Sequence, residues 1–242
     1  MLEDFHAQPA RDRVIVALDC DAATALCLAV QLRGHAKWLK VGMTLYYAEG
    51  PKIVQTFKRL GFNVFLDLKF HDIPHQVEGA AASAVLSGAD MLTMHAVGGS
   101  AMMAAGHRGA EAAAFERKVP VPATLAITVL TSMDAESLAA TGVSRALPEQ
   151  VSALAVQARE AGLSGIVCSP QEAKGMRELL GPDAFIVTPG VRPAGSAKGD
   201  QSRVATPAQA FENGASHIVV GRPITQAEDP VAAFEAIAAE LA

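Results

Sequence analysis

Short apolar runs recur along the chain, and each is followed by a segment that is rich in alanine or has apolar residues at helical spacing. The runs lie at residues 14–18, 38–42, 63–69, 91–95, 124–129, 165–168, 185–188 and 217–220. They do not alternate apolar and polar positions, which is typical of parallel strands that are buried on both faces. Eight strand–helix units within 242 residues predict a single (β/α)8 barrel, the TIM barrel.

Residues typical of helix ends support this count. Pro51 and Gly61 bracket one helical segment, and residues 206–209 (Thr-Pro-Ala-Gln) predict a capping box at the start of another. Further helices are expected in the alanine-rich stretches 79–89, 101–114, 152–161 and 231–242.

No linker divides the chain. We therefore expect one catalytic barrel domain at residues 13–242, preceded by an N-terminal extension at residues 1–12. Residues 132–148 are long enough to hold an extra helix after the fifth strand. Residues 192–203 are rich in Gly, Ser and charged residues. A long loop of this composition is often a lid over a site, and an ordinary solvated loop is the alternative.

Composition narrows the function classes. The net charge is −5 and no basic block occurs, which argues against nucleic-acid binding. No stretch has the roughly 20 apolar residues of a membrane span, and the first 13 residues contain no apolar signal core. Cys20, Cys27 and Cys168 have no metal-binding spacing and are expected to be reduced, buried thiols. These features predict a cytoplasmic protein.

Charged residues gather where the predicted strands end. Asp67 and Lys69 close an apolar strand, and because side chains alternate along a strand, both point to the same side. In a barrel that side is the interior, where an unpaired charge is costly. Lys40 interrupts the second strand, Asp19 ends the first strand and Asp72 follows the third. Working residues of such barrels lie at the carboxyl ends of the strands, so these charges predict an active site.

These charges have two other possible interpretations. A buried ion-pair network would neutralise itself, but such networks seldom stabilise a protein more than apolar packing does. The carboxylates could also hold a divalent metal ion. Two lysines among them compete with a cation, so a metal-free site is favoured.

A second group of residues follows the seventh and eighth strands. Gly190 and Arg192 follow one strand, and Gly221 and Arg222 follow the other. Loops at these positions commonly bind phosphate, because glycine admits backbone N–H groups close to an anion and arginine adds a bidentate charge. The pattern predicts a phosphorylated substrate.

Other polar residues carry less information. Thr131 and Ser132, just after the fifth strand, can donate hydrogen bonds to a polar ring. His71 and His75 have i,i+4 spacing, but the intervening proline argues against a metal pair on one helix. His95 ends the fourth strand and could line the pocket, but a core histidine is the favoured interpretation. The sequence contains no dinucleotide-binding, P-loop or zincin motif.

Taken together, these motifs resemble the orotidine 5′-phosphate decarboxylase family. The matching segments are 67–74 (Asp-Leu-Lys-Phe-His-Asp-Ile-Pro), 130–133 (Leu-Thr-Ser-Met), 189–192 (Pro-Gly-Val-Arg) and 220–224 (Val-Gly-Arg-Pro-Ile), with Lys40 upstream. They occur in the family's order over nearly the whole chain. The resemblance implies a homodimeric barrel that converts orotidine 5′-phosphate to UMP and CO2 without cofactor or metal. This reaction is the last step of de novo pyrimidine nucleotide biosynthesis.

The resemblance also implies a role for each matching residue. Lys40, Asp67, Lys69 and Asp72 form an alternating catalytic array, in which Asp72 reaches across the subunit interface and Lys69 protonates C6 of the pyrimidine. The other implied substrate contacts are Asp19 and Lys40 at the ribose, Thr131 and Ser132 facing the substrate, Pro189 near the base, Ile73 and Gln76 after the third strand, and Arg192, Gln201, Gly221 and Arg222 at the phosphate.

One position departs from the family pattern. The usual Ile-Pro-Asn-Thr is here Ile73-Pro74-His75-Gln76, so Gln76 is expected to replace the contact made by the threonine. The alternatives are a Mg²⁺-dependent sugar-phosphate decarboxylase or aldolase on the same barrel, and a phosphate-ligand binding barrel without catalytic activity. Lys40 and the segment 130–133 weigh against the first alternative, and the complete set of charged positions weighs against the second.

Overall fold

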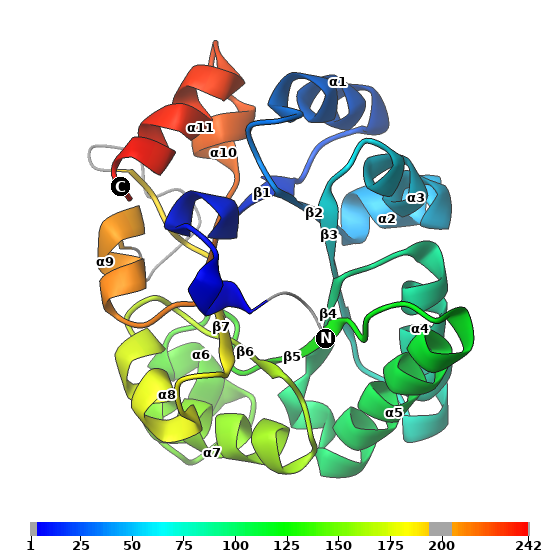
Figure 1. The fold of residues 1–242 in the computed structure, drawn as a ribbon. Coiled ribbons are helices and arrows are strands. Elements are labelled where there is room, and N and C mark those ends of the chain that lie inside the picture. The colour runs from blue at the N-terminus through cyan, green and yellow to red at the C-terminus, as the bar shows by residue number, and fades with distance from the viewer. Residues whose placement is uncertain (1–3, 194–204, 242) are drawn as a thin grey trace.

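Eight parallel strands form one closed barrel, in sequence order, in the computed structural model, which describes residues 4–193 and 205–241 (Figure 1). The predicted fold is therefore confirmed. The strands are β1 (Val14–Leu18), β2 (Trp38–Gly42), β3 (Asn63–Phe70), β4 (Met91–His95), β5 (Ala123–Ile127), β6 (Gly165–Val167), β7 (Phe185–Thr188) and β8 (His217–Val220).

Helices surround the barrel and connect its strands (Figure 1). They are α1 (Ala22–Leu32), α2 (Met43–Glu49), α3 (Pro51–Arg59), α4 (Pro74–Ser87), α5 (Ser100–Arg117), α6 (Ala135–Ala140), α7 (Leu147–Glu160), α8 (Ala173–Leu180), α9 (Pro207–Glu212), α10 (Arg222–Thr225) and α11 (Pro230–Ala239). Short 3-10 turns lie at Phe5–Ala7, Ala10–Arg13 and Ala96–Gly98. Within residues 4–193 and 205–241, no helix has the length and apolarity that crossing a membrane requires.

Local sequence signals account for several helix boundaries. The Thr206 hydroxyl accepts the backbone N–H of Gln209, and the Gln209 side chain accepts the backbone N–H of Thr206, which confirms the predicted capping box. Helix α6 lies in the segment after β5 where an extra helix is expected. The sequence does not predict α2, a seven-residue helix between two glycines that buries only Leu45.

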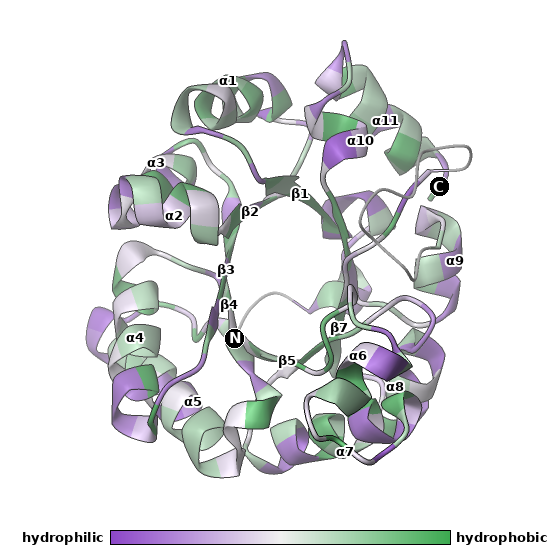
Figure 2. Ribbon diagram, turned by 180° about the vertical axis from the view of Figure 1, so that it is seen from behind, coloured by the Kyte–Doolittle hydropathy of each residue, from purple (hydrophilic) through white to green (hydrophobic). Residues whose placement is uncertain are grey.

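Apolar side chains form two layers. One fills the inside of the barrel and the other lies between the strands and the helices; the inner layer consists of Ile15, Ala17, Trp38, Phe65, Met91, Ala123, Leu125, Ile127, Val167, Val187 and Val219. Successive side chains of a strand point to opposite faces, so each strand contributes to both layers. Figure 2 accordingly shows mostly hydrophobic strands inside helices of mixed polarity. This explains why the strands appear in the sequence as continuous apolar runs.

The segment 4–13 lies across the amino-terminal end of the barrel (Figure 1). Phe5 is only 4% exposed, and its ring centroid lies 5.2 Å from that of Phe185 and 6.2 Å from that of His217. Arg11 forms an ion pair of 2.9 Å with Glu235 of α11. The described part of the predicted N-terminal extension therefore packs against the barrel.

Candidate active site

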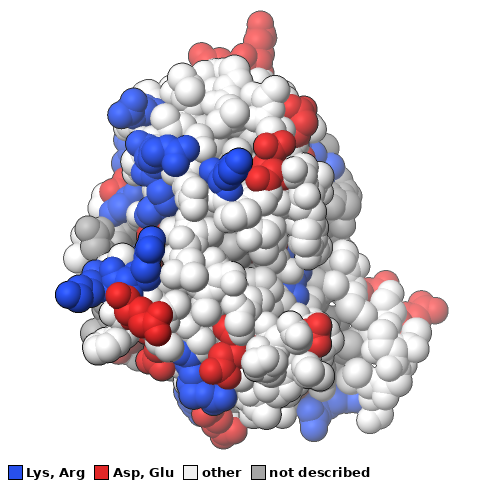
Figure 3. All heavy atoms as spheres, turned by 90° about the vertical axis from the view of Figure 1, so that its right-hand side faces the viewer, with Lys and Arg blue, Asp and Glu red and all other residues white. Residues whose placement is uncertain are grey.

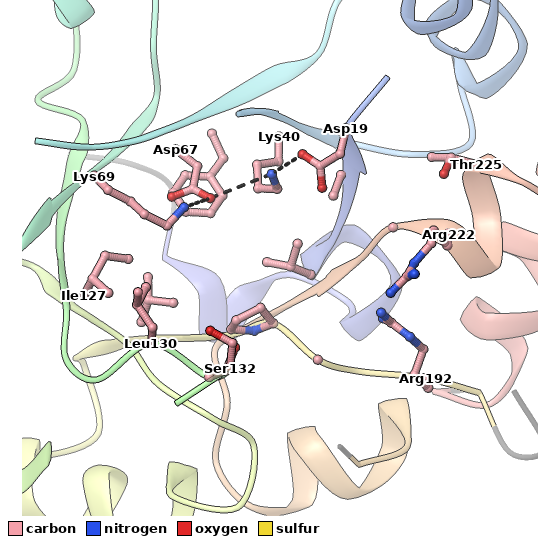
Figure 4. Close-up of a pocket in the computed structure, with 18 of the residues that line it drawn as sticks. Asp19, Lys40, Asp67, Lys69, Ile127, Leu130, Ser132, Arg192, Arg222 and Thr225 are labelled. Carbon is pink, nitrogen blue, oxygen red and sulfur yellow. Dashed lines mark hydrogen bonds and ion pairs between the residues drawn. The ribbon is translucent and has the colours of Figure 1, made fainter. Parts of the chain in front are cut away.

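A cavity of about 610 Å³ opens at the carboxyl ends of the strands (Figure 4). Its floor consists of the last apolar side chains of the inner layer. Its walls contain most of the residues that the sequence predicts for the site: Asp19, Lys40, Asp67, Lys69, Thr131, Ser132, Pro189, Arg192, Gly221 and Arg222. The fold thus brings together residues that are up to about 200 positions apart in the chain, as expected for a barrel site.

One wall of the cavity carries an alternating row of charges, which we call the charge row (Asp19, Lys40, Asp67 and Lys69). Lys69 Nζ donates to Asp67 Oδ2 at 2.8 Å. Lys40 Nζ lies 3.7 Å from the same oxygen and donates to Asp19 Oδ1 at 2.7 Å. Figure 4 shows the four side chains side by side along the wall. Each carboxylate therefore contacts an ammonium group, and Asp67 contacts two.

Strand register explains how Lys40 reaches Asp67. Lys40 points into the barrel two residues after Trp38 of the inner layer, and Gly42 of β2 is paired with Asp67 of β3. A Cβ atom at Gly42 would lie 3.0 Å from Asp19 Oδ1 and 3.1 Å from Lys40 Nζ. A larger residue there would press on the ion pair, so glycine leaves the space that the charge row needs.

Asp67 keeps its charge although it is buried. Burial alone acts to raise the pKa of its carboxyl group. The positive charges of Lys40 and Lys69, together with hydrogen bonds from Lys69 and Thr93, outweigh burial and hold the pKa of Asp67 below its usual value. Asp67 is therefore ionised at neutral pH and binds both ammonium groups.

Two arginines lie in the same cavity, away from the charge row. Arg192 follows β7 and Arg222 begins α10 directly after β8, and Figure 4 shows their guanidinium groups pointing toward each other. Gly221 lines the cavity beside Arg222. Two converging guanidinium groups next to a glycine backbone form a site suited to a phosphate group.

Some predicted site residues do not line this cavity. Asp72, Ile73 and Gln76 are exposed around the start of α4, and Asp72 Oδ1 accepts the backbone N–H of Ile73 at 2.6 Å. Gln201 and most of the predicted lid, 192–203, lie outside the described residues. Their roles stay predictions.

The cavity also contains residues that the sequence analysis does not single out. Thr24 of α1 and the pair Thr225–Gln226 at the end of α10 also line it, and Figure 4 shows Thr225 on the same side as Arg222. The pair directly follows the segment 220–224, so extending that motif by two positions would have found it. Thr24 stands in a helix without a recognisable motif, and no sequence signal points to it.

Two expectations about single residues are wrong. His95 is not a core residue: it is only partly buried at the end of β4, and its ring centroid lies 5.4 Å from that of His71. Burial, followed by the charges of His71 and Lys69, lowers the pKa of His95. The expectation of buried thiols holds for Cys168 but not for the other two cysteines. Cys20 is partly buried and lines the cavity, and Cys27 is exposed on the surface of α1.

Metal-ligating side chains are scattered in the described part of the chain. His71 precedes α4 and His75 lies in its first turn, so the two do not share a helical face. Residues 4–193 and 205–241 contain no group of three or more His, Cys, Asp or Glu side chains that could hold a metal ion.

Comparisons with known proteins identify the family of this chain. A model of the orotidine 5'-phosphate decarboxylase / HUMPS family matches residues 12–237. Orotidine 5'-phosphate decarboxylase of Moorella thermoacetica is 51% identical over 244 residues, which cover 99% of this chain and 96% of the relative. The corresponding protein of Anaeromyxobacter sp. is 51% identical over 231 residues, covering 95% and 98%.

Solved structures give the same result. The crystal structure of orotidine 5'-phosphate decarboxylase from Lactobacillus acidophilus matches with a TM-score of 0.83 and 39% identity, covering 95% of this chain and 99% of that one. The resemblance predicted from the motifs is confirmed: the chain belongs to the orotidine 5'-phosphate decarboxylase / HUMPS family.

Proposed function

We propose that this protein is a carboxy-lyase that converts orotidine 5′-phosphate to UMP and CO2, the last step of de novo pyrimidine nucleotide synthesis. The activity is the one for which the relatives from Moorella and Anaeromyxobacter are named. The observation that carries the proposal is the contact of Lys69 and Lys40 with Asp67, in a cavity that also holds two converging arginines.

The two ends of the cavity match the two charged ends of this substrate. Arg192, Arg222 and the backbone of Gly221 bind the phosphate group at one end. The carboxylated pyrimidine then faces the charge row, where Asp19 and Lys40 bind the ribose hydroxyls. Thr131, Ser132 and Pro189 contact the base; they line the cavity at the loop after β5 and the end of β7.

Lys69 provides the central chemical step. Heterolysis of the bond between C6 and the carboxylate leaves an electron pair in the plane of the pyrimidine ring, where the π system cannot delocalise it. The Lys69 ammonium stabilises this charge as it develops and then transfers a proton to C6. CO2 leaves as a neutral molecule, and Lys69 takes up a proton from solvent before the next turnover.

The enclosed cavity strengthens these interactions. Two unit charges 4 Å apart attract by about 1 kcal/mol in water and by about 4 kcal/mol at an effective dielectric constant of about 20. Asp67 is buried and holds Lys69 Nζ at 2.8 Å, so the proton donor is oriented before the substrate arrives. Catalysis by a preorganised charge of this kind requires no cofactor.

A chelation experiment tests this proposal. Decarboxylation is followed as the loss of orotate absorbance, with purified protein before and after exhaustive EDTA treatment. Asp19 and Asp67 each contact a lysine ammonium that a divalent cation would have to displace, so we expect full activity after chelation. Activity that disappears and returns with Mg²⁺ would instead support a metal-dependent sugar-phosphate enzyme. No reaction of the untreated protein would support a binding protein without catalytic activity.

We further propose that the protein is a cytoplasmic homodimer in which Asp72 completes the charge row of the partner subunit. Three observations support the dimer. Asp72 is exposed and lies outside the cavity of its own chain. Large apolar side chains are exposed in segments that follow β2, β3 and β4, including Tyr47, Ile73 and Val97. Figure 3 shows that the face carrying α2 to α5 has a largely uncharged middle.

Subunit mixing tests the shared site. Lys69→Ala and Asp72→Asn are each expected to be nearly inactive alone. In a mixed dimer, one site has both substitutions and the other has none. An equal mixture that exchanges subunits therefore recovers about a quarter of the wild-type sites. No recovery after proven exchange would mean that Asp72 acts in its own chain.

A further inference from the structure

Strand β3 is irregular at Asp67 and Lys69, the two residues that the proposed reaction uses. Strands β3 and β4 are in register up to Leu66 and again from Phe70, and in between three residues of β3 (67–69) stand opposite Thr93 alone. Bulges re-aim side chains and are frequent next to active sites. This bulge sets the directions of the Asp67 carboxylate and the Lys69 ammonium group.

The Thr93 hydroxyl spans the bulge. Its Oγ1 accepts the backbone N–H of Lys69 at 2.9 Å and donates to Asp67 Oδ1 at 3.0 Å. The other carboxylate oxygen of Asp67 receives Lys69 Nζ at 2.8 Å. Thr93 is completely buried, so water cannot replace either bond without a rearrangement. One hydroxyl thus links the backbone of Lys69 to the carboxylate that holds its side chain.

The backbone of Lys69 needs such support. Its φ angle is 54°, in the left-handed region that side chains other than glycine rarely adopt. In the described ranges the other non-glycine residue with positive φ is Lys118, which caps the end of α5. A left-handed residue is ordinary at a helix end but unusual inside a strand, and such conformations persist where surrounding contacts fix them.

We infer that Thr93 is a positioning residue for the reaction: its hydroxyl fixes the bulge so that Asp67 and Lys69 face the substrate together. The inference rests on the proposed function, because it assumes that these two side chains act on the substrate. Thr93 itself does not line the cavity. Without the hydroxyl, the carboxylate of Asp67 can rotate and the backbone of Lys69 loses its bond to Thr93.

Substitution of Thr93 tests this role in a protein whose decarboxylase activity has first been measured. Thr93→Val keeps the branched shape and removes the hydroxyl, and Thr93→Ser keeps the hydroxyl. We expect Thr93→Val to lower kcat by about ten- to a hundredfold, the effect of losing a hydrogen bond to a charged group. KM should change by less than about threefold, because the phosphate site is untouched. Thr93→Ser should restore kcat to within about threefold of wild type.

Thr124→Val is the matched control. Thr124 is also fully buried, and its hydroxyl bonds His107 Nδ1 at 2.9 Å, but it stands near the amino-terminal end of β5. The Thr124→Val variant should lose stability as Thr93→Val does and keep its kcat.

If Thr93→Val does not fold, Thr93→Ala compared with Thr93→Ser isolates the hydroxyl in the same way. Wild-type kcat in the hydroxyl-free variant, or an equal loss in the serine variant, would overturn the inference. An inactive wild type would instead overturn the proposed function.

Discussion

The two ends of the barrel interior bury ionisable side chains in opposite ways. At the carboxyl end, Asp67 is surrounded by two ammonium groups and a hydroxyl, which keep its pKa low and the carboxylate charged. At the amino end, His217 is 1% exposed and packs against the rings of Trp38, Phe185 and Phe5. Burial, followed by the charges of two nearby cations, lowers the pKa of His217 to about 3, so the ring is neutral.

This difference shows what a buried charge requires. Burial by itself favours the neutral form of an ionisable group. The charged form persists only where polar or charged partners replace the hydration that burial removes. Buried ion pairs seldom stabilise a protein more than apolar packing does. We therefore expect the carboxyl end to determine turnover and the amino end to determine stability.

Lys69→Ala is expected to give the largest effect. It removes both the proton donor and the charge that stabilises the developing electron pair, so kcat should fall by at least about ten-thousandfold. The free energy of unfolding should change little, because Lys40 still neutralises Asp67. Single-turnover decarboxylation and urea unfolding measure the two quantities on one sample.

Arg222→Ala is the control within the same cavity. It should mainly raise KM, because Arg222 lies near the opposite end of the cavity from Lys69 (Figure 4). Small and equal effects of the two substitutions would contradict the separation between a reacting end and a phosphate end.

Phe5→Ala tests the amino end. In contrast to Lys69→Ala, it should lower the free energy of unfolding and leave kcat unchanged. Truncating a buried phenylalanine costs about 3 kcal/mol or more of unfolding free energy, and Phe5 joins the segment 4–13 to the barrel. We expect kcat of the folded protein to stay unchanged, since the substitution is at the far end of the barrel. Urea unfolding and the absorbance assay check both expectations.

Phe115→Ala provides the matched comparison. Phe115 is 86% exposed at the end of α5, so its truncation should change the unfolding free energy by less than about 0.5 kcal/mol. If the two truncations cost the same, the segment 4–13 does not stabilise the barrel.

The carboxyl end is more predictable from sequence than the amino end, for a physical reason. Lys40, Asp67 and Lys69 interrupt apolar strands, and buried charges are so costly that their positions indicate function directly. Phe5 is an isolated aromatic residue in a polar segment with no periodic pattern. Its burial depends on the shape of the barrel end, which forms only when distant strands come together.

Thr93 shows a second limit of sequence reasoning. Threonine is common in strands, and in Met91–His95 it looks like an ordinary member of an apolar run. Its importance arises from the bulge in the neighbouring strand, which shifts the register between Leu66 and Phe70. Register shifts depend on pairing between strands, so the pattern of one strand does not contain them.

The pH dependence of stability is expected to be a smaller effect than those of Lys69→Ala and Phe5→Ala. The unfolded chain binds a proton at His217 near pH 6.5, whereas the folded protein does so only near pH 3. Between these values only the unfolded state carries the proton, so this group lowers stability as the pH falls, by about 1.4 kcal/mol per pH unit. From pH 7 to pH 5 wild type should lose about 2 kcal/mol more than His217→Gln, which cannot titrate.

Urea unfolding at pH 7, 6 and 5 measures this difference, and kcat of His217→Gln at pH 7 serves as the control. An unchanged kcat with diverging stability curves assigns the pH effect to the amino end alone. Parallel curves would mean that the folded protein protonates His217 as readily as the unfolded chain. The barrel interior would then tolerate a charge without the partners that Asp67 has, and the contrast between its two ends would fail.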